Sequence, residues 1–157
     1  MFPVLLKDIN ELKNIKRNKW NKIIIHHTGG AKVGKIQEIN KIIDVWHRTK
    51  VIWFWQGKKM QGWKYGMGYH IFIERNGKIY LSERWIKQLS GGHTLGQNRV
   101  GIGICCSGNL DLQELEQKQI FVLKKLIIEL KLPVFFHKEF QNKNCPGKNF
   151  PYKLFRG

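Results

Sequence analysis

The run NKIIIHHT, residues 21–28, constrains the fold more than any other stretch of the chain. A short β-branched run bounded by polar residues is typical of a buried strand. Because side chains on a strand alternate between its two faces, His26 and His27 must point in opposite directions. At most one of them can reach a given site, and the other must pack under a helix with a hydrogen-bonding partner. A single histidine at a strand end is more often such a structural residue than a metal ligand.

Three further segments have patterns of apolar and polar residues that predict a helix, a hairpin and a strand. Residues 35–49 have apolar side chains at helical spacing, which predicts an amphipathic helix. These side chains are Ile36, Ile39, Ile43 and Trp46. Apolar and polar residues alternate in two segments of residues 69–83, and Asn76-Gly77, the pair that a type I′ turn prefers, joins these segments. The pattern therefore predicts a hairpin. RVGIGICCSG, residues 99–108, predicts a central strand whose glycines lie where other backbone comes close.

The C-terminal third of the chain predicts a helix, a strand and a loop. Asp111 and Glu114 form a capping-box pattern ahead of a helix at residues 115–131. PVFFH, residues 133–137, is expected to be a short final strand. Residues 144–155 are expected to form a loop or a short helix.

The resulting order, β-α-β-β-β-α-β, predicts an α/β fold with a mixed central sheet flanked by helices. We expect a single domain over residues 1–157, because no repeat or low-complexity linker suggests a boundary. Residues 1–19 form a basic N-terminal segment. Residues 51–68, rich in tryptophan, lysine and glycine, have no clear assignment. They could form an extra hairpin that packs on the domain, or they could present tryptophans and lysines to an anionic envelope.

The net charge of +17 indicates a polyanionic partner, although charge alone does not choose among nucleic acid, anionic lipid and cell-wall polymers. Residues 13–22 hold five cations and no acid, which could equally be a solvated basic face. If the N-terminal segment binds anionic envelopes, deleting residues 1–19 should weaken that binding and spare catalysis. The chain shows no recognised nucleic-acid motif, so no specific nucleic-acid partner is expected.

His137 and Cys145 are candidate metal ligands. They lie 145 − 137 = 8 residues apart, and an imidazole with a thiolate is a good pair of zinc ligands. A third ligand from the end of the strand at residues 21–28 would give the three-ligand pattern of catalytic zinc. Cys105 and Cys106 are neighbours on a predicted strand and are expected to be core thiols on opposite faces.

Four ordered segments give the chain a resemblance to zinc-dependent N-acetylmuramoyl-L-alanine amidases of type 2. These segments are IIIHHT, GYHIFIERNGKIY, GGHTLGQNRVGIGICCSGN and FHKEFQNKNCPGKNFP. The family includes phage endolysins of the small coliphage-lysozyme kind and animal peptidoglycan recognition proteins. The resemblance covers roughly residues 20–152 and implies an amidase type 2/peptidoglycan recognition protein-like fold.

The resemblance also implies roles for particular residues. It makes His26, His137 and Cys145 the ligands of a Zn²⁺ cofactor, and members that lack activity typically lose a ligand. Bound zinc would activate a water and polarise the amide carbonyl. Lys143 would stabilise the oxyanion that develops on that carbonyl, and Tyr69 would position the water or help to move protons.

Other residues receive weaker expectations. His93 and Asn98 match positions that line the substrate groove, although a polar loop with local turn bonds would explain them equally. Glu139 is expected to orient a neighbour or cap a loop. Structural roles are expected for His47 and His70.

The chain is therefore expected to hydrolyse the bond between N-acetylmuramic acid and L-alanine in peptidoglycan, as a monomeric phage endolysin. The N-terminus lacks a signal-peptide pattern, so we expect it to wait in the host cytoplasm until the membrane is opened. The alternatives are a peptidoglycan-binding module without activity, and an amidase that also inhibits an RNA polymerase.

Overall fold

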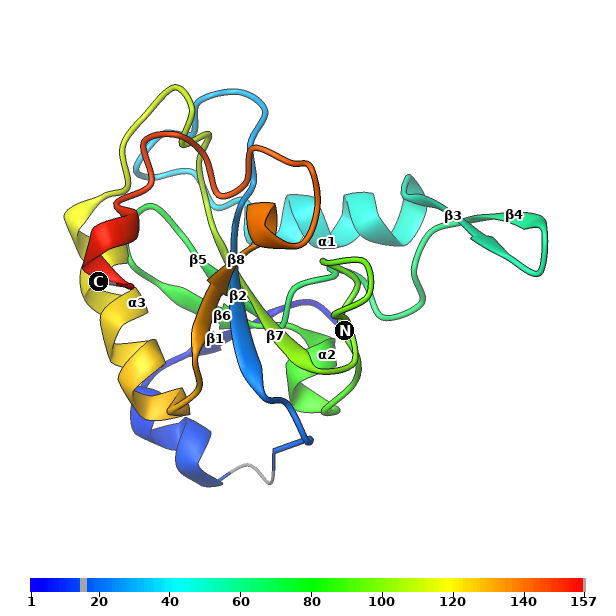
Figure 1. Cartoon of the computed structure of the whole chain (residues 1–157), viewed down its shortest axis with the longest axis horizontal. Coiled ribbons are helices and arrows are strands. Elements are labelled where there is room, and N and C mark those ends of the chain that lie inside the picture. The colour runs from blue at the N-terminus through cyan, green and yellow to red at the C-terminus, as the bar shows by residue number, and fades with distance from the viewer. Residues whose placement is uncertain (15–16, 157) are drawn as a thin grey trace.

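The computed structural model describes residues 1–14 and 17–156 and has a mixed six-stranded sheet at its centre (Figure 1). The strand order is β1-β6-β5-β7-β2-β8. The last four of these strands pair in parallel, whereas β6 pairs antiparallel with β5 and β1. The strands of this sheet are β1 (Val4–Leu6), β2 (Lys22–His27), β5 (Ile71–Ile73), β6 (Ile79–Leu81), β7 (Gly101–Cys106) and β8 (Val134–Phe136).

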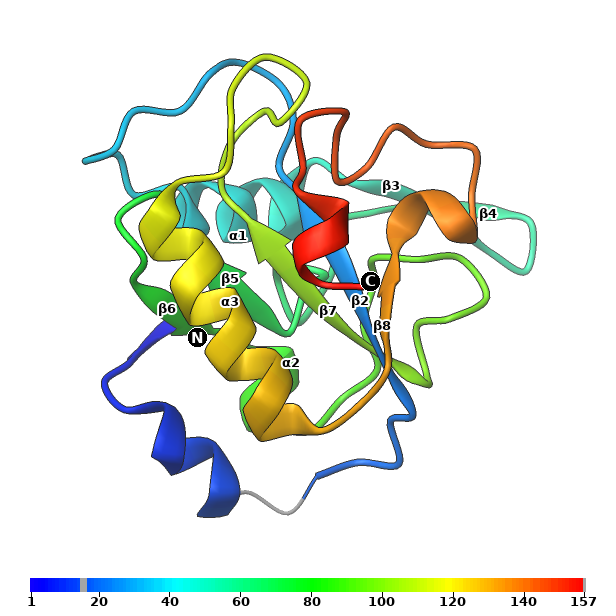
Figure 2. The same ribbon diagram turned by 60° about the vertical axis from the view of Figure 1, so that its left-hand side comes forward.

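Helices cover both faces of the sheet, which confirms the predicted class of fold. Figure 2 shows α3 (Gln117–Leu130) in front of the sheet and α1 (Asn40–Thr49) behind it. The remaining helices are α2 (Glu83–Ile86) and the 3-10 helices η1 (Ile9–Asn14), η2 (His137–Glu139) and η3 (Tyr152–Leu154). None of the helices in the described residues is long and apolar enough to cross a membrane.

The larger part of the core lies between the sheet and α3. Every second side chain of the central strands packs there with Leu123, Leu126 and Leu130 of α3. A smaller cluster on the α1 side contains Met67, Phe72, Tyr80 and Cys105. Cys105 and Cys106 thus belong to different clusters, as strand alternation requires.

The predicted apolar face of the helix at residues 35–49 is only partly correct, because Ile39 and Ile43 pack against the smaller cluster whereas Ile36 and Trp46 are exposed. The helix begins at Asn40, and Ile36 lies before it and is exposed. Its buried side chains are Asn40, Asp44 and His47. Polar groups can be buried here because neighbouring loops satisfy them. Glu74 accepts hydrogen bonds from the Ile39 and Asn40 amides, and Asp44 accepts one from the Met67 amide.

The hairpin at β5 and β6 is confirmed, but its predicted type I′ turn is wrong. The Gly77 amide donates to the Glu74 carbonyl, and the Glu74 amide donates to the Lys78 carbonyl. Gly77 has a φ of +85°, whereas Asn76 does not have a positive φ. This pattern is a three-residue loop in which a type I turn is followed by a left-handed glycine.

The capping box of α3 is also displaced from its predicted position. Glu116 is the N-cap, and its side chain pairs reciprocally with Gln119 at the third helical position. Asp111 instead accepts hydrogen bonds from Asn144 and from the Lys148 amide, which lie in the cysteine loop. The helix ends at Leu130, before Pro133, as predicted.

The N-terminal segment is built into the domain. Strand β1 pairs with β6, and Leu6 and Leu12 are buried in the main core. Deletion of residues 1–19 would remove these contacts, so we expect such a truncation to destabilise the domain, and its effect on activity stays a prediction. Of the cations predicted to form a basic face, Lys16 lies outside the described residues. Lys13 pairs with Glu129, and Arg17 donates to the Leu130 carbonyl.

Residues 51–68 contain a second, two-stranded sheet formed by β3 (Ile52–Trp55) and β4 (Lys58–Gln61). This hairpin projects away from the domain beyond the end of α1 (Figure 1). Its turn has positive φ at both Gln56 and Gly57, the conformation that a type I′ turn requires. The segment thus forms an extra hairpin, and that hairpin does not pack against the main sheet.

Candidate metal centre

Three side chains from separate segments meet on the α1 side of the sheet. His26 lies near the end of β2, His137 begins η2 directly after β8, and Cys145 lies in the loop that follows. Their ligand atoms all lie within 4.8 Å of one another. The distance from Cys145 Sγ to His26 Nδ1 is 3.7 Å. Tetrahedral zinc with its usual bond lengths separates a sulfur and a nitrogen ligand by about 3.5 Å, so the donors fit zinc.

The cysteine loop places the thiol by contacts of its own backbone. The His27 amide donates to Cys145 Sγ at 3.4 Å, and the Lys138 amide donates to the Cys145 carbonyl. Pro146 follows a cis peptide bond, and Gly147 has a φ of +109°. A Cβ at Gly147 would lie 2.7 Å from the carbonyl carbon of Leu110, so a side chain has no room there. Gly147 thus turns the backbone beside the sulfur.

A chain of hydrogen bonds determines which nitrogen of His26 carries a proton. His93 Nε2 lies 3.1 Å from the Gly101 carbonyl oxygen, which can only accept, so this nitrogen must donate. In a neutral ring, His93 Nδ1 must then be an acceptor. It lies 3.0 Å from His26 Nε2, and the Thr94 hydroxyl oxygen lies 3.3 Å from that same nitrogen and 2.9 Å from His93 Nδ1. His26 Nε2 thus faces two groups that can accept, so it donates. Nδ1 of His26, on the side of Cys145, is left with the free lone pair that a metal needs.

The same logic applies to His137. The Leu95 amide donates to Gln141 Oε1, which identifies that atom as the amide oxygen. His137 Nε2 lies 2.7 Å from the same oxygen and must therefore donate to it. Nδ1 of His137 remains unprotonated. Partners outside the ligand set thus hold both histidines in the same tautomer before any metal binds.

Two glycines create the space for the His93 ring. A Cβ at Gly103 would lie 2.5 Å from His93 Cδ2, and one at Gly91 would lie 2.3 Å from the same atom. The predicted reason for the glycine at position 103 of β7, close approach of other backbone, is therefore wrong. The neighbour is an imidazole ring, and this ring supports a metal ligand.

Burial determines the protonation of the three candidate ligands. Desolvation lowers the pKa of His26 well below its usual value, and the neighbouring His93 lowers it further. Burial also lowers the pKa of His137. Burial raises the pKa of the Cys145 thiol to about 12 in the metal-free protein. Both imidazoles are therefore ready to bind a metal at neutral pH, whereas the thiol must lose a proton.

Tyr69 and Lys143 lie beside this group. The Tyr69 ring centroid lies 5.1 Å from that of His26. Burial, together with Cys105 and Cys145, raises the pKa of the Tyr69 phenol well above its usual value, so the phenol stays protonated. Lys143 is exposed, and its positive charge lowers the pKa of His137 and of Cys145. A hydrogen-bond donor and a cation thus flank the three ligands.

His93 and Asn98 lie deeper than a simple groove-lining role suggests. His93 is 9% exposed and lies against His26. The Asn98 side chain accepts hydrogen bonds from the His93 and Thr94 amides, which are the local turn bonds considered from sequence. Contact of either residue with substrate stays a prediction. Sequence reasoning missed Gln141, and no motif distinguishes it from other polar loop residues.

The remaining histidines and Glu139 have structural partners. His27 accepts from the Leu110 amide, and His47 accepts from the Gly68 amide next to Tyr69. His70 is buried, with one ring nitrogen accepting from the Gly103 amide and the other donating to the Leu89 carbonyl. Glu139 accepts from the Phe136 amide and pairs with Arg156, so it caps the junction of β8 and η2.

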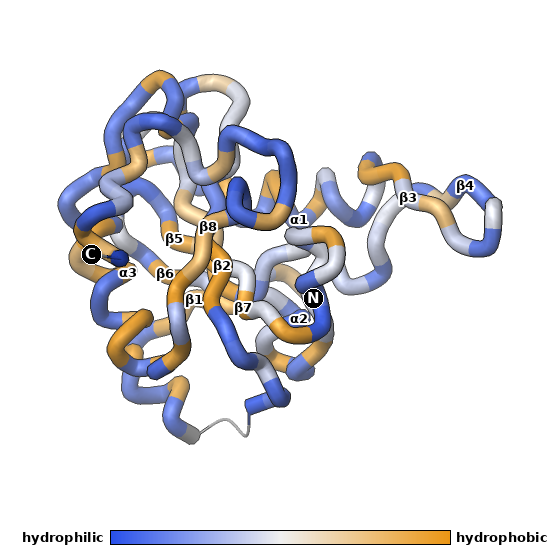
Figure 3. Tube along the Cα trace, viewed as in Figure 1, coloured by the Kyte–Doolittle hydropathy of each residue, from blue (hydrophilic) through white to orange (hydrophobic). Residues whose placement is uncertain are grey.

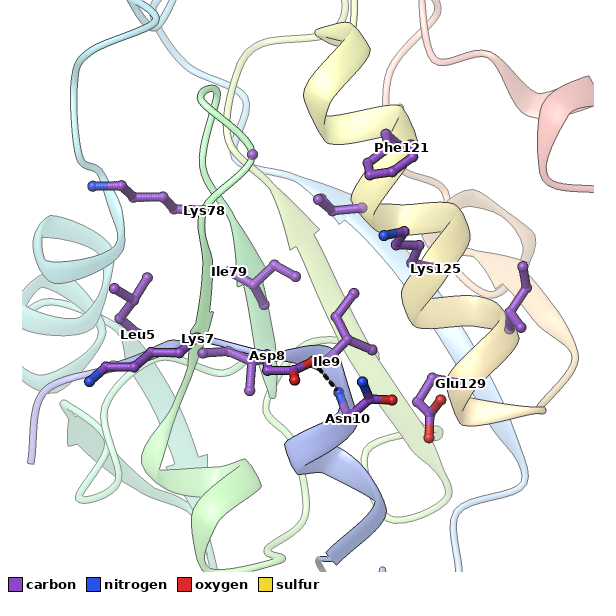
Figure 4. Close-up of a pocket in the computed structure, with 14 residues that line it drawn as sticks. Leu5, Lys7, Asp8, Ile9, Asn10, Lys78, Ile79, Phe121, Lys125 and Glu129 are labelled. Carbon is purple, nitrogen blue, oxygen red and sulfur yellow. Dashed lines mark hydrogen bonds between the residues drawn. The ribbon is translucent and has the colours of Figure 1, made fainter.

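A groove of about 730 Å³ lies away from these residues, between β1, η1 and α3 (Figure 4). Leu5, Ile79 and Phe121 line it together with Lys125 and Glu129. Among the described residues, the only group of histidine, cysteine or carboxylate side chains close enough to hold a metal is His26, His137 and Cys145.

Comparison with known proteins gives consistent results. Residues 16–148 match the family described as N-acetylmuramoyl-L-alanine amidase. Peptidoglycan-recognition protein SC2 of Drosophila simulans is 27% identical over 138 residues, which cover 80% of this chain and 67% of that protein. The solved structure of the endolysine N-acetylmuramoyl-L-alanine amidase LysCS from Clostridium intestinale URNW is 26% identical. It has a TM-score of 0.67, with coverage of 88% of this chain and 82% of that one.

A third similar structure is peptidoglycan recognition protein-LE in complex with tracheal cytotoxin, a monomeric diaminopimelic acid-type peptidoglycan. It has a TM-score of 0.69 at 17% identity, and the match covers 98% of this chain and 84% of that one. At this identity the similarity shows the fold alone.

Proposed function

This chain belongs to the N-acetylmuramoyl-L-alanine amidase family, and on that basis we propose that it is a zinc hydrolase that cleaves peptidoglycan. The bond broken is the amide between N-acetylmuramic acid and L-alanine. The observation that supports the proposal most directly is the convergence of His26, His137 and Cys145, whose ligand atoms lie within 4.8 Å of one another.

His26 and His137 would hold the metal through their unprotonated nitrogens, and Cys145 would bind as the thiolate. Zinc bound in this way supplies a water of lowered pKa and polarises an amide carbonyl. Three protein ligands leave the fourth position open to water and substrate, as in other catalytic zinc sites.

Tyr69 and Lys143 would act on the substrate amide. The Tyr69 phenol is held protonated by burial, so it can donate a hydrogen bond but cannot act as a base at neutral pH. The Lys143 side chain is exposed, and its ammonium would stabilise negative charge that develops on the carbonyl oxygen. Neither role requires a carboxylate base, and the nearest carboxylate in sequence to His137, Glu139, is paired with Arg156.

Release of L-alanine amino termini from purified peptidoglycan sacculi tests the activity. We expect zinc to support release, a chelator to stop it and Cys145→Ala to abolish both zinc binding and release. Cys106→Ala is the matched control, because Cys106 is also a buried thiol but lies on the other face of the sheet. If the wild-type protein supplied with zinc released no such ends, the proposal would be wrong.

Recognition without hydrolysis is the second candidate, because the similar Drosophila protein is named as a recognition protein. Retention of the chain on sacculi without release of amino termini would support it. The similarity to an endolysine amidase supports the further proposal that the chain is an endolysin, which reaches the cell wall from the host cytoplasm once the membrane opens. Expression in a bacterial host with and without a co-expressed holin tests this, since lysis should require the holin.

A further inference from the structure

The outer side of α1 and the projecting hairpin carry large apolar side chains that the fold does not cover. On α1, Ile42 is 61% exposed and Trp46 is 54% exposed. At the tip of the hairpin, Phe54 is 69% exposed and Trp55 is 62% exposed. Figure 3 colours the central strands β2, β7 and β8 as hydrophobic, and the same colour returns on β3 at the outer end of the molecule. We call Ile42, Val45, Trp46, Phe54 and Trp55, together with Phe2, the α1–hairpin surface.

Part of this surface is hollowed. Phe2, Ile42, Val45 and Trp46 line a shallow groove of about 440 Å³, and Lys41 and Lys50 lie at its edge. The hairpin follows directly from the C-terminal end of α1, the helix whose residues line most of the groove (Figure 1).

Lysines accompany the apolar side chains on both faces of the hairpin. Phe54 is opposite Lys59 on one face, and Trp55 is opposite Lys58 on the other. Each face of the tip therefore pairs one aromatic ring with one ammonium group. The strands are anchored at their base, where Trp53 Nε1 donates to the Gly62 carbonyl and the Gln61 side chain donates to the Thr49 carbonyl.

Negative charge is absent from this part of the chain. No acidic residue occurs between positions 44 and 74. Asp44 itself is buried and paired with Arg48 at 2.8 Å. No carboxylate from this segment therefore neutralises the lysines that accompany the α1–hairpin surface. These are Lys41, Lys50, Lys58 and Lys59.

We propose that the α1–hairpin surface docks on an anionic phospholipid bilayer, with the hairpin tip entering the interfacial layer. Trp55 and Trp46 suit that layer, where tryptophan is enriched, and the lysines can reach lipid phosphates while their stems stay among apolar groups. Phe54 and the aliphatic side chains of α1 would leave water for the acyl boundary.

Other partners would match either the charge or the apolar side chains of this surface, but not both. A nucleic acid or a soluble polyanion would pair with the lysines but would leave Ile42 and Val45 in water. A symmetric dimer through the same surface would bring the lysines of two copies together. A bilayer with anionic headgroups supplies both the negative charge and the apolar phase.

None of the residues in the α1–hairpin surface belongs to the metal centre. The docking proposal therefore does not depend on zinc binding or on hydrolysis. The proposed hydrolysis can be wrong while docking is right, and docking can be wrong while hydrolysis is right. For an enzyme that acts on a layer next to a membrane, docking would keep the protein close to its substrate.

Flotation with lipid vesicles tests the proposal. We expect the full-length protein to float with vesicles of phosphatidylcholine and phosphatidylglycerol in equal parts, and not with phosphatidylcholine alone. The double variant Phe54→Ser/Trp55→Ser should bind the anionic vesicles at least ~10-fold more weakly, because both rings lose their apolar contact. Lys58→Gln/Lys59→Gln should weaken binding by about fivefold for each lysine removed.

Matched substitutions on the other side of the molecule are the controls. Phe121 on α3 is 59% exposed, and Lys124 and Lys153 are exposed without an ion pair among the described residues. Phe121→Ser and Lys124→Gln/Lys153→Gln should bind vesicles like the wild type. A cooperative urea unfolding transition like that of the wild type, in every variant, shows that the fold is intact.

Three results would overturn the proposal. One is normal vesicle binding by the hairpin double variant, and another is an equal loss in the α3 controls. The third combines two observations. The wild type does not bind vesicles, and sedimentation velocity without lipid shows a dimer that the hairpin substitutions dissociate. That result would assign the surface to a second copy of the chain.

Discussion

The hydrogen bond between His26 and His93 leads to a prediction about zinc affinity. His93→Leu removes the acceptor that lies 3.0 Å from His26 Nε2 and the donor that lies 3.1 Å from the Gly101 carbonyl. Leucine has a similar volume, so the main loss is that of these two hydrogen bonds and of the contact between His93 Nδ1 and the Thr94 hydroxyl. The Thr94 hydroxyl, 3.3 Å from His26 Nε2, is then the remaining partner of that nitrogen among the described residues, and it fixes the tautomer less firmly because a hydroxyl can donate or accept. Loss of such a supporting partner typically weakens metal binding by about 10–100-fold, or about 1.4–2.7 kcal/mol.

The same substitution leaves the Gly101 carbonyl buried without its partner. We expect this to lower the free energy of unfolding of the metal-free protein by about 1–3 kcal/mol. Zinc affinity is measured by competition with a chromophoric chelator, and stability by urea unfolding of the metal-free protein. Measuring both separates a weaker site from a weaker fold.

His70→Leu is the matched control. His70 is as buried as His93 and bonds to a backbone amide and a carbonyl, but it makes no hydrogen bond to a ligand residue. It should lose stability while zinc affinity changes by less than about threefold, well below the loss expected for a supporting partner. If a folded His93→Leu protein bound zinc as tightly as the wild type, the argument from the hydrogen-bond chain would be refuted.

Three further predictions follow from the same geometry. Gly103→Ala should weaken zinc binding about tenfold, because its Cβ would lie 2.5 Å from His93 Cδ2 and displace the ring; a normal affinity in the chelator assay would contradict this. Zinc binding at pH 6 should release about one proton, from the Cys145 thiol, because burial raises its pKa to about 12 and keeps His26 neutral. Calorimetry in buffers of different ionisation enthalpy measures this number, and a value near zero would contradict the assignment. The metal-free protein should lose stability as the pH falls from 6.5 towards 4. Burial lowers the pKa of His47 and of His70 to about 4 in the folded protein. In this pH range the unfolded chain therefore takes up protons that the folded chain does not. The loss should reach about 2 kcal/mol for each histidine at pH 5, and His47→Gln should reduce the slope in urea titrations.

Local pattern was enough to predict the class of fold and to separate the roles of His26 and His27. Alternation along a strand is a property of the backbone itself, so adjacent residues of β2 must face opposite sides whatever packs against them. The structure places His26 with His137 and Cys145, and His27 against Leu110 on the other side. Short-range periodicity likewise located β5, β6 and α3 to within a few residues.

Errors arose where tertiary contacts override local preference. Ile39 and Ile43 of the predicted apolar face pack on the core, but Ile36 and Trp46 are exposed, because Glu74 and the Met67 amide satisfy buried polar groups of α1. Asn76-Gly77 suggested a type I′ turn, yet that conformation occurs at Gln56-Gly57. A two-residue preference is weak compared with the register of the strands it joins.

Residue identity and strand alternation are therefore enough to say which side chains are available to the metal centre and that His26 and His27 face opposite ways. How these side chains are held depends on contacts between distant segments. His93 is 67 residues from His26, and Leu95 is 46 residues from Gln141, so the bonds that select each ring nitrogen join segments that no local pattern connects. The tautomer of a metal ligand depends on its hydrogen-bonding partner, and the partner is known only when the chain has folded.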